Sequence, residues 1–292
     1  MEVNVQVFTG IATLILTVSM LFNPESALYL PDYGIFVSEV GKPGVRDGRI
    51  VLIHFEDNNF GGKEVFATGM IDPKGITYDR SKRCLLVADV DKVWKVDLRT
   101  REVSIFLNPS DFPKKPSFLN DILWTSKGVY ISDTNLNTVF VYEDGKVKTL
   151  LKLPKPNGLA LGNDGALFIA SFSDPSGKVY KYKGGQLRLF AKGGEINGTD
   201  GVFFDRRRDI LIVSGYWSGS VVVYDLHGNV LGIIRRKLRH PADIYYDTKK
   251  MYVFIPDMGR GKLFVYKIRD DIRSQRGTVG NQEEGACSCG CH

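Results

Sequence analysis

The sequence has few of the residues that cross-link small secreted domains. It contains four cysteines among 292 residues. Cys84 stands alone in an apolar stretch, whereas Cys287, Cys289 and Cys291 crowd the end of the chain beside His292. A disulfide framework therefore cannot hold the core. The alternating thiols at the end of the chain are compatible with a soft-metal site or with an exposed, redox-sensitive tail.

Histidine is equally scarce, with four residues in the chain. His54, His227 and His240 share no spacing and no motif. This pattern argues against a zinc site built from imidazole ligands.

Long apolar runs are also missing. The run from Ile11 to Phe22 is too short to span a bilayer, so we expect no membrane-spanning domain. No Lys or Arg precedes it and no clear small-x-small cleavage site follows, which leaves the signal-peptide pattern incomplete. Residues 1–22 are therefore either a strand, over Leu14 to Leu21, or a signal or anchor. We expect a cytoplasmic protein, with secretion or N-terminal anchoring as the alternative.

The formal net charge of +6 raises the question of a nucleic-acid partner. The basic clusters Arg80 to Arg83 and Arg206 to Arg208 fall inside predicted hairpin turns, where solvated basic residues are ordinary. We therefore expect a small-molecule substrate and no nucleic acid.

What the sequence does contain is a repeat. A short opening motif, an apolar strand, a tight polar turn and a second apolar strand return six times, at intervals of 37 to 49 residues. The opening motifs are Pro24-Glu25-Ser26, Pro73-Lys74-Gly75, Leu119-Asn120-Asp121, Pro156-Asn157-Gly158, Thr199-Asp200-Gly201 and Pro241-Ala242-Asp243. Repeats of this period are typical of propeller blades.

The fourth unit shows the pattern most clearly. Leu159 to Leu161 predicts an inner strand, Asn163-Asp164-Gly165 a hairpin turn, and Leu167 to Ala170 a second strand. The alternating segment Val179 to Tyr182 and the outer segment Leu187 to Phe190 complete a four-stranded unit.

We therefore expect an all-β protein, a six-bladed β-propeller of four-stranded antiparallel blades over residues 23–268, followed by a disordered Cys-containing tail over residues 269–292. The sixth unit ends at Leu263 to Tyr266 without an outer strand. An N-terminal strand would cover that edge, which would otherwise expose unpaired backbone groups.

The middle residues of the opening motifs converge on one mouth of such a propeller, because each inner strand begins beside the axis. They are Glu25, Lys74, Asn120, Asn157, Asp200 and Ala242. Asn-Gly and Asp-Gly pairs also occur in ordinary turns, but here the hairpin turns lie elsewhere in each unit. Carboxylates and amides gathered in a partly dry space need a cation or buried hydrogen bonds.

Glu25, Asn157 and Asp200 offer oxygen ligands only, which predicts one divalent metal ion. Oxygen donors favour Ca²⁺, with Mg²⁺ next, and Zn²⁺ or Mn²⁺ remain compatible.

The ordered set of opening motifs resembles the gluconolactonase, regucalcin and luciferin-regenerating-enzyme family, over Leu14 to Ile268. The resemblance implies a six-bladed propeller that holds one divalent metal through a Glu, an Asn and an Asp and hydrolyses sugar lactones or related esters. Carried over by motif, Glu25, Asn157 and Asp200 are the metal ligands, Asp200 is also the general base, and Asn120 contacts substrate.

One position departs from that family. Its sugar-lactone members place an Arg two residues before the Asn of the third motif, where this chain has Phe118. This departure argues against an aldonolactone substrate. We expect Phe118 and Lys74 to line the substrate-binding site with Asn120, where Lys74 either supplies a replacement positive charge for the substrate or balances the carboxylates.

Loops that follow the second strand of each blade emerge on the same side as the opening motifs. They place Asp133, Tyr216, Trp217 and Asp257 at the substrate mouth. Two other functions fit the blade pattern: a non-catalytic NHL-like binding propeller, and a strictosidine-synthase-like or paraoxonase-like enzyme. A binding scaffold has no need for Glu, Asn and Asp together at axial positions.

Overall fold

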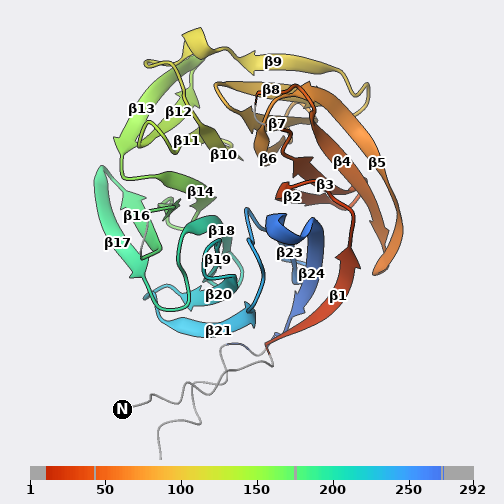
Figure 1. Ribbon diagram of the computed structural model, residues 1–292. Helices are drawn as coiled ribbons and strands as arrows, with labels where there is room; N and C mark the ends of the chain where they lie inside the picture. The colour runs from red at the N-terminus through yellow and green to blue at the C-terminus, as the bar shows by residue number, and fades with distance from the viewer. Residues whose placement is uncertain (1–10, 43, 174–175, 271, 273–292) are drawn as a thin grey trace, which may run out of the picture.

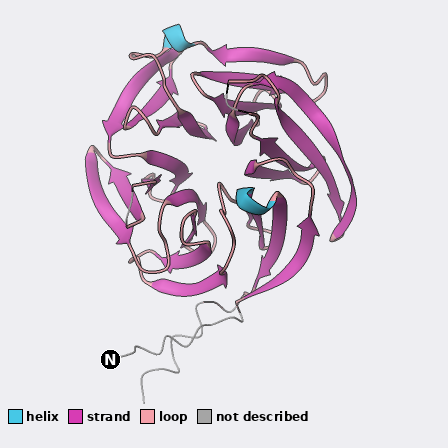
Figure 2. Ribbon diagram, viewed as in Figure 1, coloured by secondary structure: helices cyan, strands magenta, loops and turns pink. Residues whose placement is uncertain are grey.

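The computed structural model describes residues 11–42, 44–173, 176–270 and 272. Cys287, Cys289 and Cys291 of the predicted tail lie outside these residues. Its strands form six four-stranded antiparallel sheets arranged in a ring, as the repeat predicts (Figure 1). Figure 2 shows that strands make up nearly all of the regular structure. The helices of the described residues are the short 3₁₀ turns η1 (Pro109–Asp111) and η2 (Met258–Arg260), and neither could cross a membrane.

The first five blades each take four consecutive strands from the chain. Blade 1 contains β2 (Pro24–Leu30), β3 (Gly34–Glu39), β4 (Gly48–Glu56) and β5 (Asn59–Met70). Blade 2 contains β6 (Pro73–Asp79), β7 (Cys84–Asp89), β8 (Lys92–Asp97) and β9 (Val103–Leu107). Blade 3 contains β10 (Leu119–Thr125), β11 (Gly128–Asp133), β12 (Thr138–Glu143) and β13 (Lys146–Lys152).

The next two blades repeat this layout. Blade 4 contains β14 (Pro156–Leu161), β15 (Leu167–Ser171), β16 (Lys178–Lys183) and β17 (Gln186–Lys192). Blade 5 contains β18 (Thr199–Asp205), β19 (Ile210–Gly215), β20 (Ser220–Asp225) and β21 (Val230–Arg235). In each blade the first strand is innermost and the fourth lies at the rim (Figure 1).

Blade 6 joins the two ends of the described chain. It contains β22 (Tyr245–Asp247), β23 (Tyr252–Asp257), β24 (Lys262–Ile268) and, as its outer strand, β1 (Ala12–Val18). Strand β1 runs antiparallel to β24, with Ala12 opposite Ile268 and Val18 opposite Leu263. The segment before the first opening motif therefore covers the edge of the last blade and closes the ring.

The inner strand of blade 6 is shorter than the others. Its opening motif makes one isolated bridge, from Pro241 to Asp257, and the continuous strand begins at Tyr245. At the other end, Asp270 and Ile272 lie in the stretch that the sequence predicted to be disordered, yet Asp270 pairs with Arg208 and Ile272 is buried. Contact with the propeller thus continues past Ile268.

The apolar core is divided among the interfaces between neighbouring blades. Leu28 and Phe36 of blade 1 pack with Leu85 and Val87 of blade 2, and five comparable clusters of buried residues fill the other interfaces. Strands β3, β7, β19, β20 and β23 are buried along their whole length. Their nearly continuous apolar sequence follows from having both faces covered by adjacent blades.

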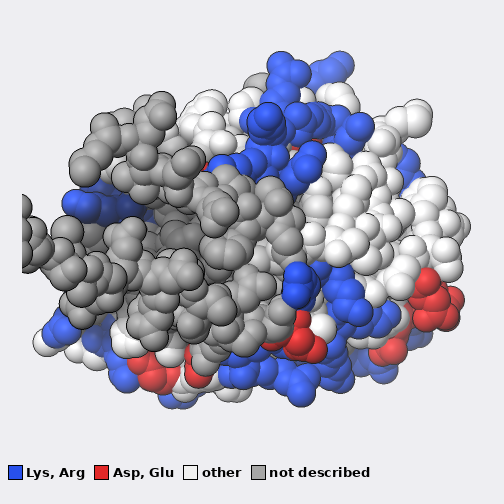
Figure 3. All heavy atoms as spheres, turned by 90° about the horizontal axis from the view of Figure 1, so that it is seen from below, with Lys and Arg blue, Asp and Glu red and all other residues white. Residues whose placement is uncertain are grey.

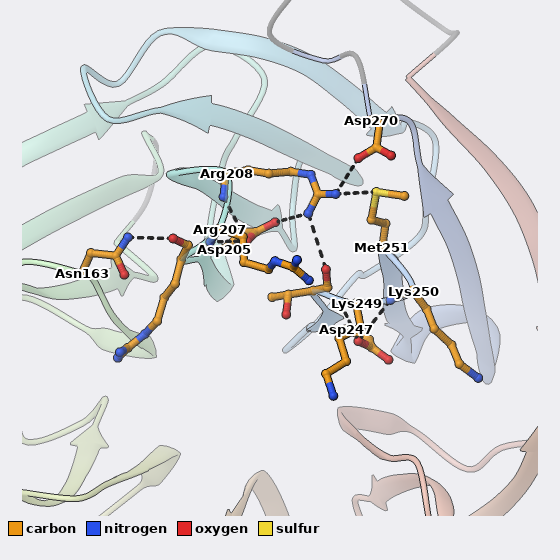
Figure 4. A network of polar contacts seen from close by, with 11 residues as sticks. Asn163, Asp205, Arg207, Arg208, Asp247, Lys249, Lys250, Met251 and Asp270 are labelled. Carbon is orange, nitrogen blue, oxygen red and sulfur yellow. Dashed lines mark hydrogen bonds and ion pairs between the residues drawn. The ribbon is translucent and has the colours of Figure 1, made fainter.

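The basic clusters lie in hairpin turns, as predicted. Arg208 follows β18 and donates from its guanidinium to Asp205, to the Thr248 carbonyl oxygen and to Asp270 (Figure 4). It therefore ties the inner turn of blade 5 to that of blade 6. Figure 3 views the propeller from its edge. Where grey atoms do not cover the view, Lys and Arg lie toward both faces of the ring, and mainly other residues lie between them.

Candidate active site around the propeller axis

The opening motifs share one backbone irregularity. In blades 1 to 5 the inner strand skips register with its neighbour at the middle and third residues of the motif. In blade 4, for example, Pro156 pairs with Ser171 and the ladder resumes at Leu159 opposite Ile169. Such a bulge frees two residues from the ladder and redirects their side chains. Figure 1 shows the inner strands around the centre of the ring, so the polar middle residues lie on the strands nearest the axis.

Serine hydroxyls satisfy three of the amide groups that the bulges release. Ser38, Ser132 and Ser214 occupy the same place near the end of the second strand of blades 1, 3 and 5. Their hydroxyl oxygens accept hydrogen bonds from the backbone N–H groups of Ser26, Asp121 and Gly201, at 2.9, 2.9 and 2.8 Å. Buried backbone donors need such partners, so the serines stabilise the bulges.

Three buried side-chain oxygens at these motifs have no hydrogen-bond partner. They are Oε2 of Glu25, Oδ1 of Asn157 and Oδ1 of Asp200. The three residues are 4%, 2% and 5% exposed. A buried polar atom without a partner is rare in folded proteins and calls for a ligand or another explanation. The same residues were predicted as the metal ligands from the sequence.

Asn157 and Asp200 lie close together: the Asn157 side chain lowers the pKa of the Asp200 carboxyl, and a Cβ on Gly158 would lie 2.4 Å from the Asp200 carbonyl oxygen. Glu25 belongs to the same group, since its charge interacts with those of Lys74 and Asp200. The motifs of blades 1, 4 and 5 therefore bring their oxygen-bearing side chains into one region.

Burial governs the protonation of these carboxyl groups. It raises the pKa of Glu25 well above its ordinary value, and Lys74 opposes this while Asp200 adds to it. Burial likewise raises the pKa of Asp200 to about 7, against the attraction of Lys74. A positive charge among these groups would favour their ionised forms.

Lys74 is itself committed to local partners. Its Nζ donates to Oδ1 of Asp72 at 2.7 Å and lies 4.6 Å from the centre of the Phe118 ring. Its buried ammonium group attracts the charges of Glu25 and Asp200. Lys74 and Phe118, which were predicted to contact substrate, thus lie together at the edge of the carboxylate group.

Asn120 is the remaining predicted substrate contact. Its Nδ2 donates to the hydroxyl of Thr134 at 3.1 Å, and that hydroxyl donates to the Pro156 carbonyl oxygen at 2.7 Å. The Asn120 amide is therefore oriented by a link that runs from blade 3 to blade 4.

Two further carboxylates were not singled out from the sequence. Asp121 and Asp243 are the third residues of their motifs, where blades 2, 4 and 5 have glycine. Asp121 accepts from the backbone N–H of Leu159 in the next blade at 2.6 Å, and burial raises its pKa to about 6. Asp243 accepts from the Ser26 hydroxyl at 2.6 Å, and burial raises its pKa well above its ordinary value.

Close packing between motifs explains the glycines. A Cβ on Gly75 would lie 2.5 Å from Oδ1 of Asp121, and one on Gly158 would lie 2.4 Å from the Asp200 carbonyl oxygen. These contacts hold neighbouring inner strands against each other. The glycines at the third position of the opening motifs were the sequence signal for this close packing, because each leaves room for an Asp side chain or a backbone of the next motif.

Two of the four residues predicted to lie at the substrate mouth are not exposed there. Asp133 and Asp257 are fully buried rather than exposed at a mouth. Asp133 accepts from the backbone N–H groups of Ser117 and Phe118, and Asp257 accepts from those of Arg239 and His240. These aspartates fix the segments that lead into the inner strands, because loop N–H groups next to a buried strand end need acceptors.

Tyr216 does lie near the carboxylates. Burial, together with the negative charges of Asp200 and Glu25, raises the pKa of the Tyr216 phenol. Trp217 is adjacent to it, with the two ring centres 4.8 Å apart.

A pocket of about 740 Å³ lies elsewhere, at the hairpin-turn ends of blades 1 and 6. Its lining includes Tyr29, Asp32, His54 and Lys250 and none of the predicted site residues. It is therefore separate from the candidate site.

The donor set fits a hard divalent cation. Two carboxylates and one amide supply oxygen ligands, and one oxygen of each has no partner within the protein. Over the described ranges, no cluster of three or more His, Cys, Asp and Glu side chains has metal-binding spacing. A metal site at the axis would accordingly depend on the amide oxygen of Asn157.

Comparison with known proteins agrees with the fold. The family model described as the SMP-30/Gluconolactonase/LRE-like region matches residues 52–255. No curated protein matches the chain.

Solved structures include similar propellers at low sequence identity. A gluconolactonase from Xanthomonas campestris is 15% identical, with a TM-score of 0.71 over 87% of this chain and 89% of that one. A proposed gluconolactonase is 16% identical, with a TM-score of 0.70 over 88% and 92%. A chain of a nidogen/laminin complex is 16% identical, with a TM-score of 0.60 over 78% and 92%. At these identities the structures show a shared fold.

Proposed function

Because the chain belongs to the SMP-30/gluconolactonase/LRE-like family, we propose that it is a metal-dependent hydrolase of a lactone or related ester. Its divalent cation, Ca²⁺ by preference, would be held by Glu25, Asn157 and Asp200. The observation that carries this proposal is the convergence of three buried, unpartnered oxygens from three different blades. A protein whose axis served only as a scaffold would have no reason to keep them.

A divalent cation bound there would polarise the substrate carbonyl and stabilise the negative charge that develops on its oxygen. The protein supplies the rest of the chemistry. Asp200 takes a proton from the attacking water, whose oxygen bonds to the carbonyl carbon. The bond from that carbon to the ring or ester oxygen then breaks, and the leaving oxygen takes up a proton.

Asp200 suits the role of base. Its carboxylate is buried beside the other proposed ligands, and a bound cation would favour its ionised form, which can accept a proton. The nearby Asn157 amide favours the ionised form of the carboxylate.

Asn120 and Lys74 are the groups we assign to substrate binding. The Asn120 side chain is held by Thr134, so its orientation is set before substrate arrives. Lys74 provides positive charge beside Phe118. Preset orientation of this kind lowers the entropy lost when substrate binds.

The test is hydrolysis with and without metal. Purified protein treated with chelator and then titrated with Ca²⁺, Mg²⁺, Mn²⁺ or Zn²⁺ would be assayed on γ-butyrolactone, glucono-δ-lactone, δ-decalactone and 4-nitrophenyl acetate. We expect turnover that requires metal and that falls at least a hundredfold in Asp200→Asn. The matched control is Asp32→Asn, an exposed carboxylate in the turn at the far end of β2.

Failure of the metal-loaded wild-type protein to hydrolyse any of these compounds would overturn the proposal. An NHL-like binding propeller would then be the better interpretation, and the fold it shares with a chain of the nidogen/laminin complex is compatible with that.

A further inference from the structure

A cluster of aromatic rings adjoins the carboxylates at the candidate site. Tyr216 stacks on His240, with ring centres 4.4 Å apart and planes 5° from parallel. Trp217 meets the edge of Tyr216, and Phe172 lies 5.5 Å from Tyr216 and 5.8 Å from Trp217 between ring centres. The four rings come from blades 4 and 5 and from the segment that leads into blade 6. We call them the aromatic wall.

The aromatic wall is attached to the strand that carries Asp200. The backbone N–H of Tyr216 donates to the Gly198 carbonyl oxygen at 2.9 Å, and that of Trp217 donates to the Asn197 carbonyl oxygen at 3.0 Å. Gly198 is two residues before Asp200 in the sequence. The position of the wall relative to the proposed catalytic base is therefore fixed by backbone hydrogen bonds.

Trp217 has one covered and one open side. A Cβ on Gly198 would lie 2.1 Å from Cδ1 of the indole, and Gly198 has a φ of +60°, so only glycine fits under the ring. The tryptophan is nevertheless 54% exposed. A large apolar ring held in place beside a polar site, with much of its surface in water, is a binding surface for an apolar group.

The other side of the site offers little for a chain of hydroxyl groups. Phe118 contributes an apolar ring there, which lies against the ammonium group of Lys74. Lys74 gives one of its three N–H groups to Asp72 and the Asn120 amide gives one of its two to Thr134, so these two side chains supply the few polar contacts on this side. Polar recognition of a polyol needs several free donors and acceptors, because buried polar groups left unpaired weaken binding.

We propose that the substrate carries an aromatic or aliphatic group that packs against Trp217 and Tyr216, in place of the polyhydroxyl chain of an aldonolactone. This inference rests on the proposed hydrolase function and specifies its substrate class.

The test compares lactones that differ in the apolar group. The metal-loaded protein would be assayed on γ-butyrolactone, δ-decalactone, dihydrocoumarin and glucono-δ-lactone. We expect kcat/KM to be at least tenfold higher for δ-decalactone or dihydrocoumarin than for glucono-δ-lactone. In Trp217→Ala we expect that preference to fall about tenfold, mainly through a higher KM for the apolar lactone.

Two further variants separate the wall from general effects of mutation. Gly198→Ala should displace the indole and reduce the same preference. Phe60→Ala, which removes an exposed aromatic ring from β5 in blade 1, should leave it unchanged.

The outcomes distinguish the inference from the function on which it rests. Hydrolysis that favours glucono-δ-lactone, or a preference that survives in Trp217→Ala, would overturn the inference and leave the hydrolase function standing. Absence of hydrolysis on every lactone would overturn both.

Discussion

Asn157 lies near Asp200 on the neighbouring inner strand and lowers the pKa of its carboxyl, yet one oxygen of each side chain remains buried and unpartnered. The two residues come from equivalent positions of blades 4 and 5, where bulges release them from their strands. Glu25 adds a third unpartnered oxygen from blade 1. These buried, unpartnered oxygens destabilise the metal-free protein, and a bound cation would supply the partner that they lack.

Asp200→Asn should stabilise the metal-free protein while it weakens metal binding. At pH 8 the wild-type carboxylate is ionised, because its pKa is about 7, and it is buried beside Asp121 and Glu25. The neutral amide removes this repulsion, which we expect to raise Tm by a few degrees in chelator, corresponding to about 1 kcal/mol. Asp32→Asn is the control and should leave Tm unchanged. A lower Tm for Asp200→Asn in chelator would contradict this prediction.

Metal-free protein should lose stability as the pH rises from about 4 to 7. The pKa values of Asp121 and Asp200 are raised from the ordinary value of 3.8 to about 6 and about 7. A carboxyl group with a raised pKa in the folded chain stabilises the fold while it is protonated, and that contribution disappears as the pH passes the folded pKa. Thermal unfolding in chelator should show Tm falling over this range.

Saturating Ca²⁺ should reverse that trend, because the cation binds the ionised carboxylates and competes with protons. The stabilisation by Ca²⁺ should therefore grow with pH over the same window. A Tm in chelator that stays level or rises between about pH 4 and pH 7 would show that the pKa values of these groups are not raised in the folded state.

Gly158→Ala should destabilise the protein by about 2 to 4 kcal/mol through overpacking. The new Cβ would lie 2.4 Å from the Asp200 carbonyl oxygen and 2.8 Å from the Val202 nitrogen, and backbone atoms cannot move aside easily. Gly165→Ala is the matched control. Gly165 has a φ of +75° but no atom within 4 Å of the added Cβ, so only backbone strain of about 1 kcal/mol applies. Chemical denaturation of both variants would decide, and equal losses would refute the steric explanation.

Ser26→Ala should weaken the junction between blades 1 and 6. The Ser26 hydroxyl donates to the buried Asp243 carboxylate at 2.6 Å, and we expect its loss to lower the free energy of unfolding by about 1 to 3 kcal/mol. Ser220→Ala removes an equally buried hydroxyl whose contact, to the Ser218 carbonyl oxygen, is 3.4 Å long and lies within blade 5. The junction would be dispensable if the two variants unfolded at the same denaturant concentration.

The blade architecture was predictable because each blade is specified locally. A segment such as Leu159 to Ala170 contains two apolar strands and an Asn-Asp-Gly turn, and the structure has β14, β15 and that turn in the same places. The repeat also showed that the last blade lacked an outer strand. The convergence of Glu25, Asn157 and Asp200 followed from their equivalent positions in the repeat.

The rest of the site depends on contacts between blades, which the repeat does not encode. Asp121 and Asp243 had no predicted role in the sequence, because their burial comes from the neighbouring motifs against which they pack. Asp133 and Asp257 are the last residues of strands that lead toward the mouth, but their side chains are buried and accept hydrogen bonds from loop N–H groups. Trp217 packs on Gly198, which lies in another loop 19 residues earlier in the sequence, and no local sequence pattern predicts this contact.

Titration calorimetry of the chelator-treated protein with Ca²⁺ tests the proposed site most directly. We predict one equivalent of bound Ca²⁺ for the wild-type protein and for the control Asp32→Asn, and affinity reduced at least a hundredfold in Glu25→Gln, Asn157→Ala and Asp200→Asn. Absence of binding by Ca²⁺, Mg²⁺, Mn²⁺ and Zn²⁺ alike, or binding that all three site variants retain, would contradict a metal site at the propeller axis.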